Sequence, residues 1–338
     1  MKAVIVDKDY GSVTPDEVEI VKEVYGKAGI ELIAVHYETE DGIIEGCRDA
    51  EVILGTGNPP ITRRVMEALP KLQYVQRFGV GVNSIDLDAA AEMGKIVLNI
   101  PGFCAKELAD LAAAMILGLV RNTNYYDREI RKGNWPKCQY LLPPDVRELC
   151  LGLYGFGAAG QHLYRIFSGG FGTKVIACDP FLPEFVKAQF PDVEFVTFDE
   201  MITKSDIISI HVGLTPETRH IFNRDTFKKM KNTAMIINTA RGPIIDQKAL
   251  AWALENGEIL YAGLDTVEQE PIDANDPLLH MDNVILSPHS GSYGIGAKKT
   301  QINAVCTLVP TAVTQKTLPA RNVANRKVIE KIEGIQFV

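Results

Sequence analysis

The stretch "GLYGFGAAGQ", residues 152–161, decides the fold of this chain. Its glycines follow the spacing G-x-G-x-x-G at Gly155, Gly157 and Gly160. The apolar segment 149–154 before it predicts a strand, and "QHLYRIF" after it predicts a helix. In such a unit the first glycine permits a tight turn, the second admits a pyrophosphate and the third lets helix and strand pack closely. This context favours a dinucleotide site over a merely flexible turn.

The predicted site calls for NAD as the cofactor. The helix that begins near Ala158 and Ala159 would present free N–H groups to the phosphates. Asp179 ends the next predicted strand, 19 residues beyond Gly160. A carboxylate there can hold the ribose hydroxyls and would repel the 2′-phosphate of NADP. The alternative is an aspartate that only ends a strand, but the following "PFLP" offers no arginine for a 2′-phosphate.

Strand and helix signals alternate on both sides of this stretch. Residues 1–100 hold several short apolar strands, and Thr14 with Glu17 predicts a capping box at the first helix. An apolar helix over about 105–122 and a polar connector over 121–149 precede the second alternating series. Such alternation predicts an α/β fold with parallel sheets covered by helices.

The length, net charge and cysteine content of the chain exclude some classes of binding partner. The 338 residues suffice for about two domains, and the net charge of −8 comes without a basic tract. This argues against nucleic acid or a membrane as the partner. The six cysteines are scattered, with neither a disulfide framework nor a metal-binding pattern, and no signal or membrane-spanning segment is evident. We expect a cytoplasmic protein that binds a small molecule and no metal.

Three polar residues follow predicted strands in the second series: Arg241, Glu270 and His289. Taken singly, each has an ordinary explanation as a surface ion-pair partner, a turn residue or a loop histidine. Together they provide the parts for reversible reduction of a 2-oxo acid. A guanidinium grips a carboxylate in a fork. An imidazole can protonate the carbonyl oxygen as hydride arrives at carbon, and a neighbouring carboxylate would orient that imidazole.

These motifs resemble the D-isomer-specific 2-hydroxyacid dehydrogenase family. The similarity runs in family order from about residue 50 to 292 and includes "FGVGVNSIDLDAA", "INTARGPIID", "AGLDTVEQEP" and "SPHSG". The resemblance implies a Rossmann-type NAD-binding domain, residues 101–292, inserted into a smaller flavodoxin-like substrate-binding domain. That second domain would comprise residues 1–100 plus about 293–338. It also implies homodimers that form through the NAD-binding domains.

The resemblance also implies roles for individual residues. Arg241 would bind and polarise the substrate, His289 would be the acid/base and Glu270 its partner. Backbone groups of Val80 and Gly81 would bind the substrate carboxylate. The resemblance further places a set of residues along the cofactor, with Asp265 at the nicotinamide carboxamide and the others being His211, Val212, Gly213, Thr218, Thr239, Ala240 and Arg241.

Some positions depart from the family pattern. Ala158 and Ala159 replace the larger side chains that relatives often carry, and Gly213 stands where many have proline. The phosphoglycerate enzymes carry an arginine near the position of 56–58, which here reads Thr-Gly-Asn, so we expect an unphosphorylated substrate. The segment "HVGLTPETRHIFN" resembles the C-terminal-binding-protein corepressors most. An NAD(H)-sensing binding protein with secondary dehydrogenase activity is therefore the alternative function.

Overall fold

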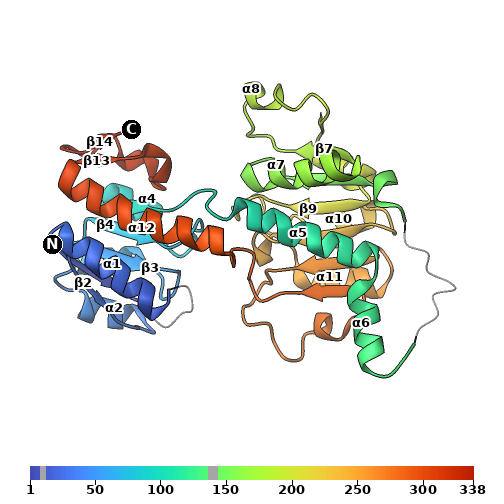
Figure 1. Cartoon of the computed structure of the whole chain (residues 1–338), viewed down its shortest axis with the longest axis horizontal. Coiled ribbons are helices and arrows are strands. Elements are labelled where there is room, and N and C mark those ends of the chain that lie inside the picture. The colour runs from blue at the N-terminus through green and yellow to red at the C-terminus, as the bar shows by residue number, and fades with distance from the viewer. Residues whose placement is uncertain (8–12, 136–143) are drawn as a thin grey trace. The chain divides into compact units, whose positions relative to one another are not determined.

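The computed structural model describes residues 1–7, 13–135 and 144–338. The chain divides into two compact units, which Figure 1 colours by residue number. Unit 1 comprises Met1–Phe103 and Gly294–Val338, and unit 2 comprises Cys104–Tyr293. All pairs of neighbouring named strands in the described residues run parallel. The predicted α/β fold class is therefore confirmed.

Unit 1 contains a five-stranded sheet in the order β2-β1-β3-β4-β5, which is the flavodoxin-like order. Its strands are β1 Lys2–Ile5, β2 Glu31–Ala34, β3 Val52–Gly55, β4 Tyr74–Arg77 and β5 Ile96–Leu98. Its helices are α1 Pro15–Lys27, α2 Glu40–Gly46, α3 Arg63–Ala68, α4 Leu87–Glu92 and α12 Ile295–Gln315. A separate small sheet pairs β13 Thr317–Leu318 with β14 Gln336–Phe337.

The strands of unit 1 bury both faces, because successive side chains of a strand point to opposite sides. Ala3 and Ile5 join a core with α1 and α12, whereas Val4 and Val6 join a second core with α2, α3 and α4. The C-terminal helix α12 lies beside α1 (Figure 1). The capping box predicted at Thr14 is present at the start of α1.

Unit 2 contains a seven-stranded sheet in the order β12-β11-β10-β9-β6-β7-β8. Its strands are β6 Cys150–Tyr154, β7 Lys174–Cys178, β8 Glu194–Phe195, β9 Ile207–Ile210, β10 Met235–Asn238, β11 Tyr261–Leu264 and β12 Val284–Leu286. This is the Rossmann order with one strand added. Chain order reverses between β6 and β9, and the carboxyl ends of strands at such a reversal form the usual ligand crevice.

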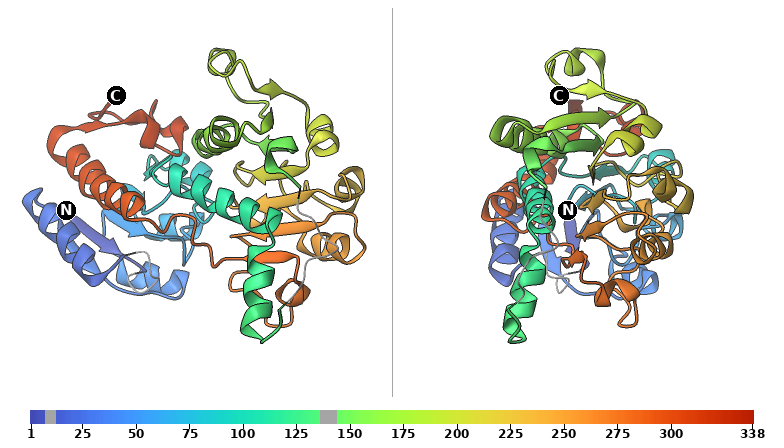
Figure 2. Two further views of the ribbon diagram at one scale, coloured as in Figure 1. Left: turned by 45° about the vertical axis from the view of Figure 1, so that its right-hand side comes forward. Right: turned by 90° about the vertical axis from the view of Figure 1, so that its right-hand side faces the viewer.

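Helices cover both faces of this sheet, as the right-hand view of Figure 2 shows. The helices are α5 Ala105–Val120, α6 Thr123–Arg131, α7 Ala158–Tyr164, α8 Glu184–Lys187, α9 Phe198–Lys204, α10 Arg224–Lys229 and α11 Gln247–Glu255. Ile207 packs with α5 and α7, whereas its neighbour Ile208 packs with α9, α10 and α11. The alternation buries both faces of the sheet, while the parallel strand direction places the carboxyl ends of all its strands at one edge.

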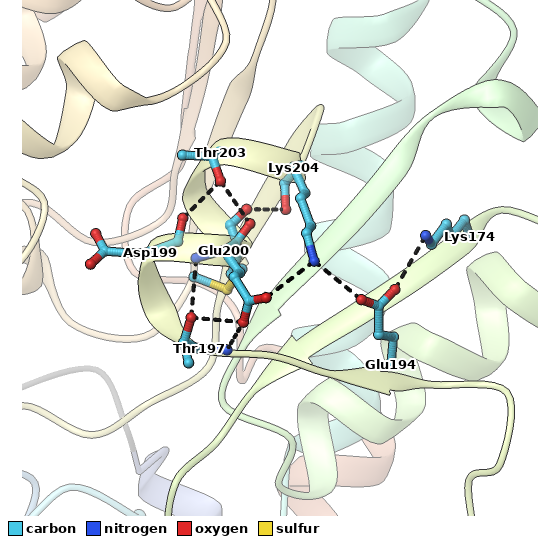
Figure 3. Close-up of polar contacts among 9 residues, drawn as sticks. Lys174, Glu194, Thr197, Asp199, Glu200, Thr203 and Lys204 are labelled. Carbon is cyan, nitrogen blue, oxygen red and sulfur yellow. Dashed lines mark hydrogen bonds and ion pairs between the residues drawn. The ribbon is translucent and has the colours of Figure 1, made fainter.

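Charged side chains protect the edge of the sheet at β8 (Figure 3). Thr197 and Glu200 form a capping box at the start of α9. Lys204 lies 3.2 Å from Glu194 and 3.4 Å from Glu200, and Lys174 lies 3.3 Å from Glu194. Exposed pairs of this kind contribute about 0–1 kcal/mol each. Their charges also disfavour edge-to-edge pairing with another chain.

The segment 121–149 was expected to be a polar connector, and its described part contains the nine-residue helix α6, which the sequence did not indicate. Most side chains of α6 are polar or charged and none of its residues is buried, so the sequence has no long apolar segment there that would indicate a helix. In the described part of the chain, no helix is long and apolar enough to cross a membrane. The cytoplasmic location stays a prediction.

Candidate active site

The glycine turn lies at the carboxyl end of β6. Gly155 has φ +95°, and a Cβ there would lie 2.8 Å from the carbonyl oxygen of His211. A Cβ on Gly160 would lie 2.5 Å from the carbonyl oxygen of Gly155. A Cβ on Gly157, by contrast, would meet nothing within 4 Å. Packing therefore requires the first and third glycines, while the second borders open space at the start of α7.

Asp179 follows β7 directly and faces the glycine turn. Its Oδ2 accepts a hydrogen bond from the N–H of Phe156 at 2.9 Å, and its Oδ1 accepts one from the N–H of Phe181 at 3.1 Å. A carboxylate oxygen can accept more than one hydrogen bond, so both oxygens remain able to accept ribose hydroxyls. The carboxylate of Asp179 therefore also stabilises the conformation of the glycine turn.

Replacing Asp179 is expected to change cofactor preference. Asp179→Asn removes the charge but keeps an oxygen acceptor for the turn. We expect the NADH/NADPH ratio of kcat/KM to fall by about 10-fold or more, because hydrogen bonds to a charged group contribute about 1.5–3 kcal/mol. Asp179→Ala should lower this ratio too, and should weaken binding of both cofactors through the loosened turn. An unchanged ratio in Asp179→Asn would contradict the ribose assignment.

The loop after β9 carries four of the predicted cofactor residues. The hydroxyl of Thr218 donates to the carbonyl of Gly213 at 2.9 Å and closes the loop. His211 lies beside the glycine turn, and its Nε2 is 2.9 Å from the hydroxyl of Ser209. Val212 also borders the turn, since a Cβ on Gly155 would lie 2.9 Å from its Cγ1. Desolvation lowers the pKa of His211 to about 4, so its imidazole is neutral at neutral pH.

This neutral imidazole should make stability depend on pH. In the unfolded chain His211 takes up a proton below about pH 6.5, whereas the folded protein binds it only near pH 4. The unfolded state therefore gains protons first, and stability falls as the pH drops from 6.5 towards 4. The loss is at most about 1.4 kcal/mol per pH unit. The free energy of unfolding of wild type and His211→Gln is measured with denaturant across this pH window. The variant should lose less of its free energy of unfolding as the pH falls. Equal losses in the two proteins would contradict the assignment.

Arg241 lies in the turn after β10. Asn238 holds this turn, because its Oδ1 accepts from the N–H of Ala240 at 3.0 Å and its Nδ2 donates to the carbonyl of Arg241 at 2.9 Å. Burial lowers the pKa of Arg241, while the charge of Glu270 opposes that shift. Among the described residues, the guanidinium makes no ion pair within 4.0 Å. Arg241 is therefore a largely buried cation with capacity for a substrate carboxylate.

Glu270 and His289 form the predicted pair. Nδ1 of His289 lies 2.7 Å from Oε2 of Glu270, and both side chains are partly exposed. Burial is the largest influence on the pKa of Glu270 and acts to raise it. The hydrogen bond and charge of His289, the N–H of Val267 and the charge of Arg241 outweigh burial, so the pKa lies below its ordinary value. Because an ionised carboxylate can only accept, Nδ1 carries the proton and Nε2 is left for proton exchange.

Asp265 organises the loop that carries His289. Its carboxylate is 2% exposed and accepts from the hydroxyl of Ser287 at 2.5 Å, from the N–H of Ser290 at 2.8 Å and from the N–H of Gly291 at 2.9 Å. His289 itself has φ +52°, and its N–H donates to the Asp265 carbonyl at 2.8 Å. These contacts fix an unfavourable backbone conformation. The contact of Asp265 with a nicotinamide carboxamide stays a prediction.

Sequence reasoning missed the contacts that join the turns of Arg241 and Glu270. A Cβ on Gly242 would lie 1.9 Å from the carbonyl oxygen of Val267, so only glycine fits there. Glu268 accepts from the N–H of Gln247 at 3.1 Å and lies 2.5 Å from Nε2 of His220. Gly242 lies in "ARGP" and Glu268 lies in "VEQEP", two motifs that the sequence analysis singled out. The contact between these two turns is long-range, and no pattern in the sequence indicates it.

Val80 and Gly81 lie in unit 1, in the segment after β4. The carbonyl of Val80 accepts from Nδ2 of Asn99 at 2.7 Å, and that of Gly81 accepts from Nε of Arg77 at 2.8 Å. Their N–H groups make no hydrogen bond within the described residues. The segment thus presents backbone donors, as the prediction requires.

The residues of unit 2 fit a dinucleotide. Open space at Gly157, an uncapped start of α7 and a carboxylate after the second strand match the phosphates and the ribose. The hydroxyl oxygen of Thr239 is buried and has no hydrogen-bond partner among the described residues. Such a buried hydroxyl gains a partner if a polar ligand binds nearby.

Comparison with known proteins decides the family. The family model described as "D-isomer specific 2-hydroxyacid dehydrogenase, NAD binding domain" matches residues 113–291. The chain belongs to this family. It is an NAD-dependent oxidoreductase, and NAD is its cofactor, as predicted.

Several named members of the family are similar to this chain over most of its length. A glyoxylate reductase of Korarchaeum cryptofilum is 38% identical over 253 residues, which cover 74% of this chain and 76% of that protein. A hydroxypyruvate reductase of Thermotoga maritima is 36% identical over 287 residues, 84% of this chain and 92% of that protein. A solved structure of D-lactate dehydrogenase from Aquifex aeolicus with NAD and lactic acid is 26% identical. It has a TM-score of 0.82 and covers 93% of this chain and 96% of that one.

Proposed function

We propose that this dehydrogenase reduces a small, unphosphorylated 2-oxo acid to the D-2-hydroxy acid, with His289 as the proton donor. The observation that carries the proposal is the pair of His289 Nδ1 and Glu270 Oε2 at 2.7 Å, next to the buried cation Arg241. In this proposal unit 2 binds the cofactor and unit 1 contributes to binding the substrate. The names of the similar reductases support this reaction class.

The chemical step follows from the donors and charges of unit 2. When bound, the reduced nicotinamide supplies the hydride that forms the new C–H bond at the substrate C2. His289 gives the proton on Nε2 to the carbonyl oxygen, which becomes the hydroxyl as the C=O π bond breaks. Glu270 holds the ring and stabilises the charged imidazolium before transfer. Arg241 grips the carboxylate and polarises the carbonyl through its fork of N–H donors.

Charge in unit 1 supports an unphosphorylated substrate. No arginine occupies positions 56–58, Arg77 beside Gly57 donates to the carbonyls of Gly55 and Gly81, and the arginines of α3 are paired with carboxylates on the surface. Arg63 lies 2.7 Å from Glu92, and Arg64 pairs with Asp41. A phosphate would need to displace such a partner to gain a bidentate contact.

The experiment that tests the function is consumption of NADH across a panel of 2-oxo acids. The panel contains glyoxylate, pyruvate, hydroxypyruvate, branched and aromatic 2-oxo acids and phosphohydroxypyruvate. We expect turnover with glyoxylate or hydroxypyruvate and little with the phosphorylated compound. Tight NADH binding without turnover on any member would contradict the enzymatic proposal and favour the NAD(H)-sensing binding protein.

We also propose that the chain forms homodimers through unit 2. Helix α6 has no buried residue, and its Ile130 is 49% exposed. A single exposed apolar residue does not mark an interface by itself, so the proposal rests on the family resemblance, and Ile130 provides the position at which to test it. Sedimentation should give twice the chain mass for wild type and a shift to monomer for Ile130→Asp. Ile20→Asp, at an equally exposed isoleucine of α1, is the control and should stay dimeric. A monomeric wild type would contradict the proposal.

A further inference from the structure

Every carbonyl of the segment 79–81 is held by a donor from outside the segment. This segment follows β4 in unit 1, where the carboxyl ends of parallel strands meet. The three hydrogen bonds run from the N–H of Ile100 to the Gly79 carbonyl at 3.0 Å, from Nδ2 of Asn99 to the Val80 carbonyl at 2.7 Å and from Nε of Arg77 to the Gly81 carbonyl at 2.8 Å.

The hydrogen bonds to these carbonyls also fix the direction of the N–H group that follows each carbonyl in the chain. A trans peptide is planar, and its C=O and N–H point in opposite directions. The N–H groups of Val80, Gly81 and Val82 therefore point away from the donors that hold the preceding carbonyls. None of the three donates a hydrogen bond within the described residues, and Val80 is 40% exposed. Successive free N–H groups of this kind form a cradle for an anion.

Arg77 is itself fixed by its surroundings. Its Nη1 donates to the carbonyl of Gly55 at 3.2 Å, and a Cβ on Gly57 would lie 3.3 Å from its Nη2. Arg77 lines a small cavity together with Asp7, whose carboxylate is 3% exposed and accepts hydrogen bonds from Thr56. Burial raises the pKa of Asp7, while Thr56 and the charge of Arg77 oppose the shift.

The cavity is therefore lined by the partly buried guanidinium of Arg77 and by the buried carboxylate of Asp7. Oδ1 of Asp7 is buried and has no hydrogen-bond partner among the described residues. Such a group is costly unless a charge compensates it. The hydrogen bonds of Thr56 and the charge of Arg77 offset part of this cost, and the hydrogen bonds of Arg77 to the carbonyls of Gly55 and Gly81 hold its guanidinium in place.

We propose that Arg77 and Asn99 are positioning residues for the substrate carboxylate. They hold the Gly81 and Val80 carbonyls so that the N–H groups of residues 80–82 receive the carboxylate of the 2-oxo acid. This inference rests on the proposed function. Neither side chain touches the reacting atoms, so their loss should weaken substrate binding far more than the hydride step.

The test uses Arg77→Gln and Asn99→Ala in the full-length protein, with steady-state kinetics and inhibition by oxamate as an unreactive carboxylate. Each variant should raise the KM of the best 2-oxo acid and the Ki of oxamate in parallel, by about 10-fold, because each loses one strong hydrogen bond. The kcat should fall less than about threefold, and the KM of NADH should not change. Asn99→Asp should be worse than Asn99→Ala, since a carboxylate cannot donate to the Val80 carbonyl.

Controls separate this role from a merely structural one. Arg63→Gln removes an exposed arginine of the same unit and should leave both constants unchanged. If Arg77→Gln destabilises the protein, Asn99→Ala still decides the point. If the wild type turns over a 2-oxo acid and the variants have the same KM and the same Ki for oxamate, the inference is overturned. The proposed function is then unaffected. A wild type without turnover on any 2-oxo acid overturns the proposed function and the inference with it.

Discussion

Replacing His289 by asparagine is expected to lower kcat for 2-oxo acid reduction by about 1,000-fold. A positioned general acid contributes about 100- to 10,000-fold, and asparagine cannot supply the proton. Asparagine also tolerates the positive φ of this position, so the loop should keep its shape. Stopped-flow or steady-state loss of NADH absorbance measures the effect. The Kd of NADH should stay within about twofold, since the cofactor contacts predicted here lie elsewhere.

His220 offers a matched control for this prediction. It also has φ +52°, and its Nε2 lies 2.5 Å from a glutamate, Glu268. His220→Asn should therefore perturb the fold about as much as His289→Asn but lower kcat by less than about tenfold. Similar losses in both variants would mean that His289 acts through the structure, and near-normal turnover in His289→Asn would remove it from the mechanism.

Replacing Arg241 by methionine is expected to lower kcat/KM for the 2-oxo acid by about 1,000-fold. Two charge-assisted hydrogen bonds to the substrate contribute about 3–6 kcal/mol together. The loss should appear in both KM and kcat, because the guanidinium binds the carboxylate and also polarises the carbonyl. Steady-state kinetics with glyoxylate or hydroxypyruvate measure both constants.

The variant Arg241→Lys separates the effect of the positive charge from the effect of bidentate hydrogen bonding. Lysine keeps a cation but cannot make two parallel N–H contacts, so its kcat/KM should lie between those of the wild type and Arg241→Met. NADH binding, measured by fluorescence, should change little in either variant. A kcat/KM within tenfold of wild type in Arg241→Met would contradict the assigned role.

Local patterns accounted for much of the fold. The capping box at Thr14, the strand before Gly155 and the position of Asp179 depend on near neighbours, so spacing alone predicts them. Helix α6 was missed because it is short and mostly polar, and none of its residues is fully buried.

The supporting contacts of the site could not be predicted in the same way. The three residues proposed to be catalytic stood out because their residue types match the chemistry. Asn99 and Val80 are 19 residues apart, and Gln247 and Glu268 are 21 apart. Nothing in either segment alone indicates such a pair, since only the folded sheet brings the strand ends together.

The most direct test of the account follows the hydride itself. NADH carrying deuterium at both C4 positions is incubated with the protein and the best 2-oxo acid of the panel, and the product is analysed by mass spectrometry and chiral chromatography. We expect a D-2-hydroxy acid with one deuterium at C2, formed at the rate of NADH loss and absent with His289→Asn. Glyoxylate gives no stereocentre without the label, so a substituted 2-oxo acid is used for the configuration. Loss of NADH without a deuterated hydroxy acid, or formation of the L-isomer, would contradict the account.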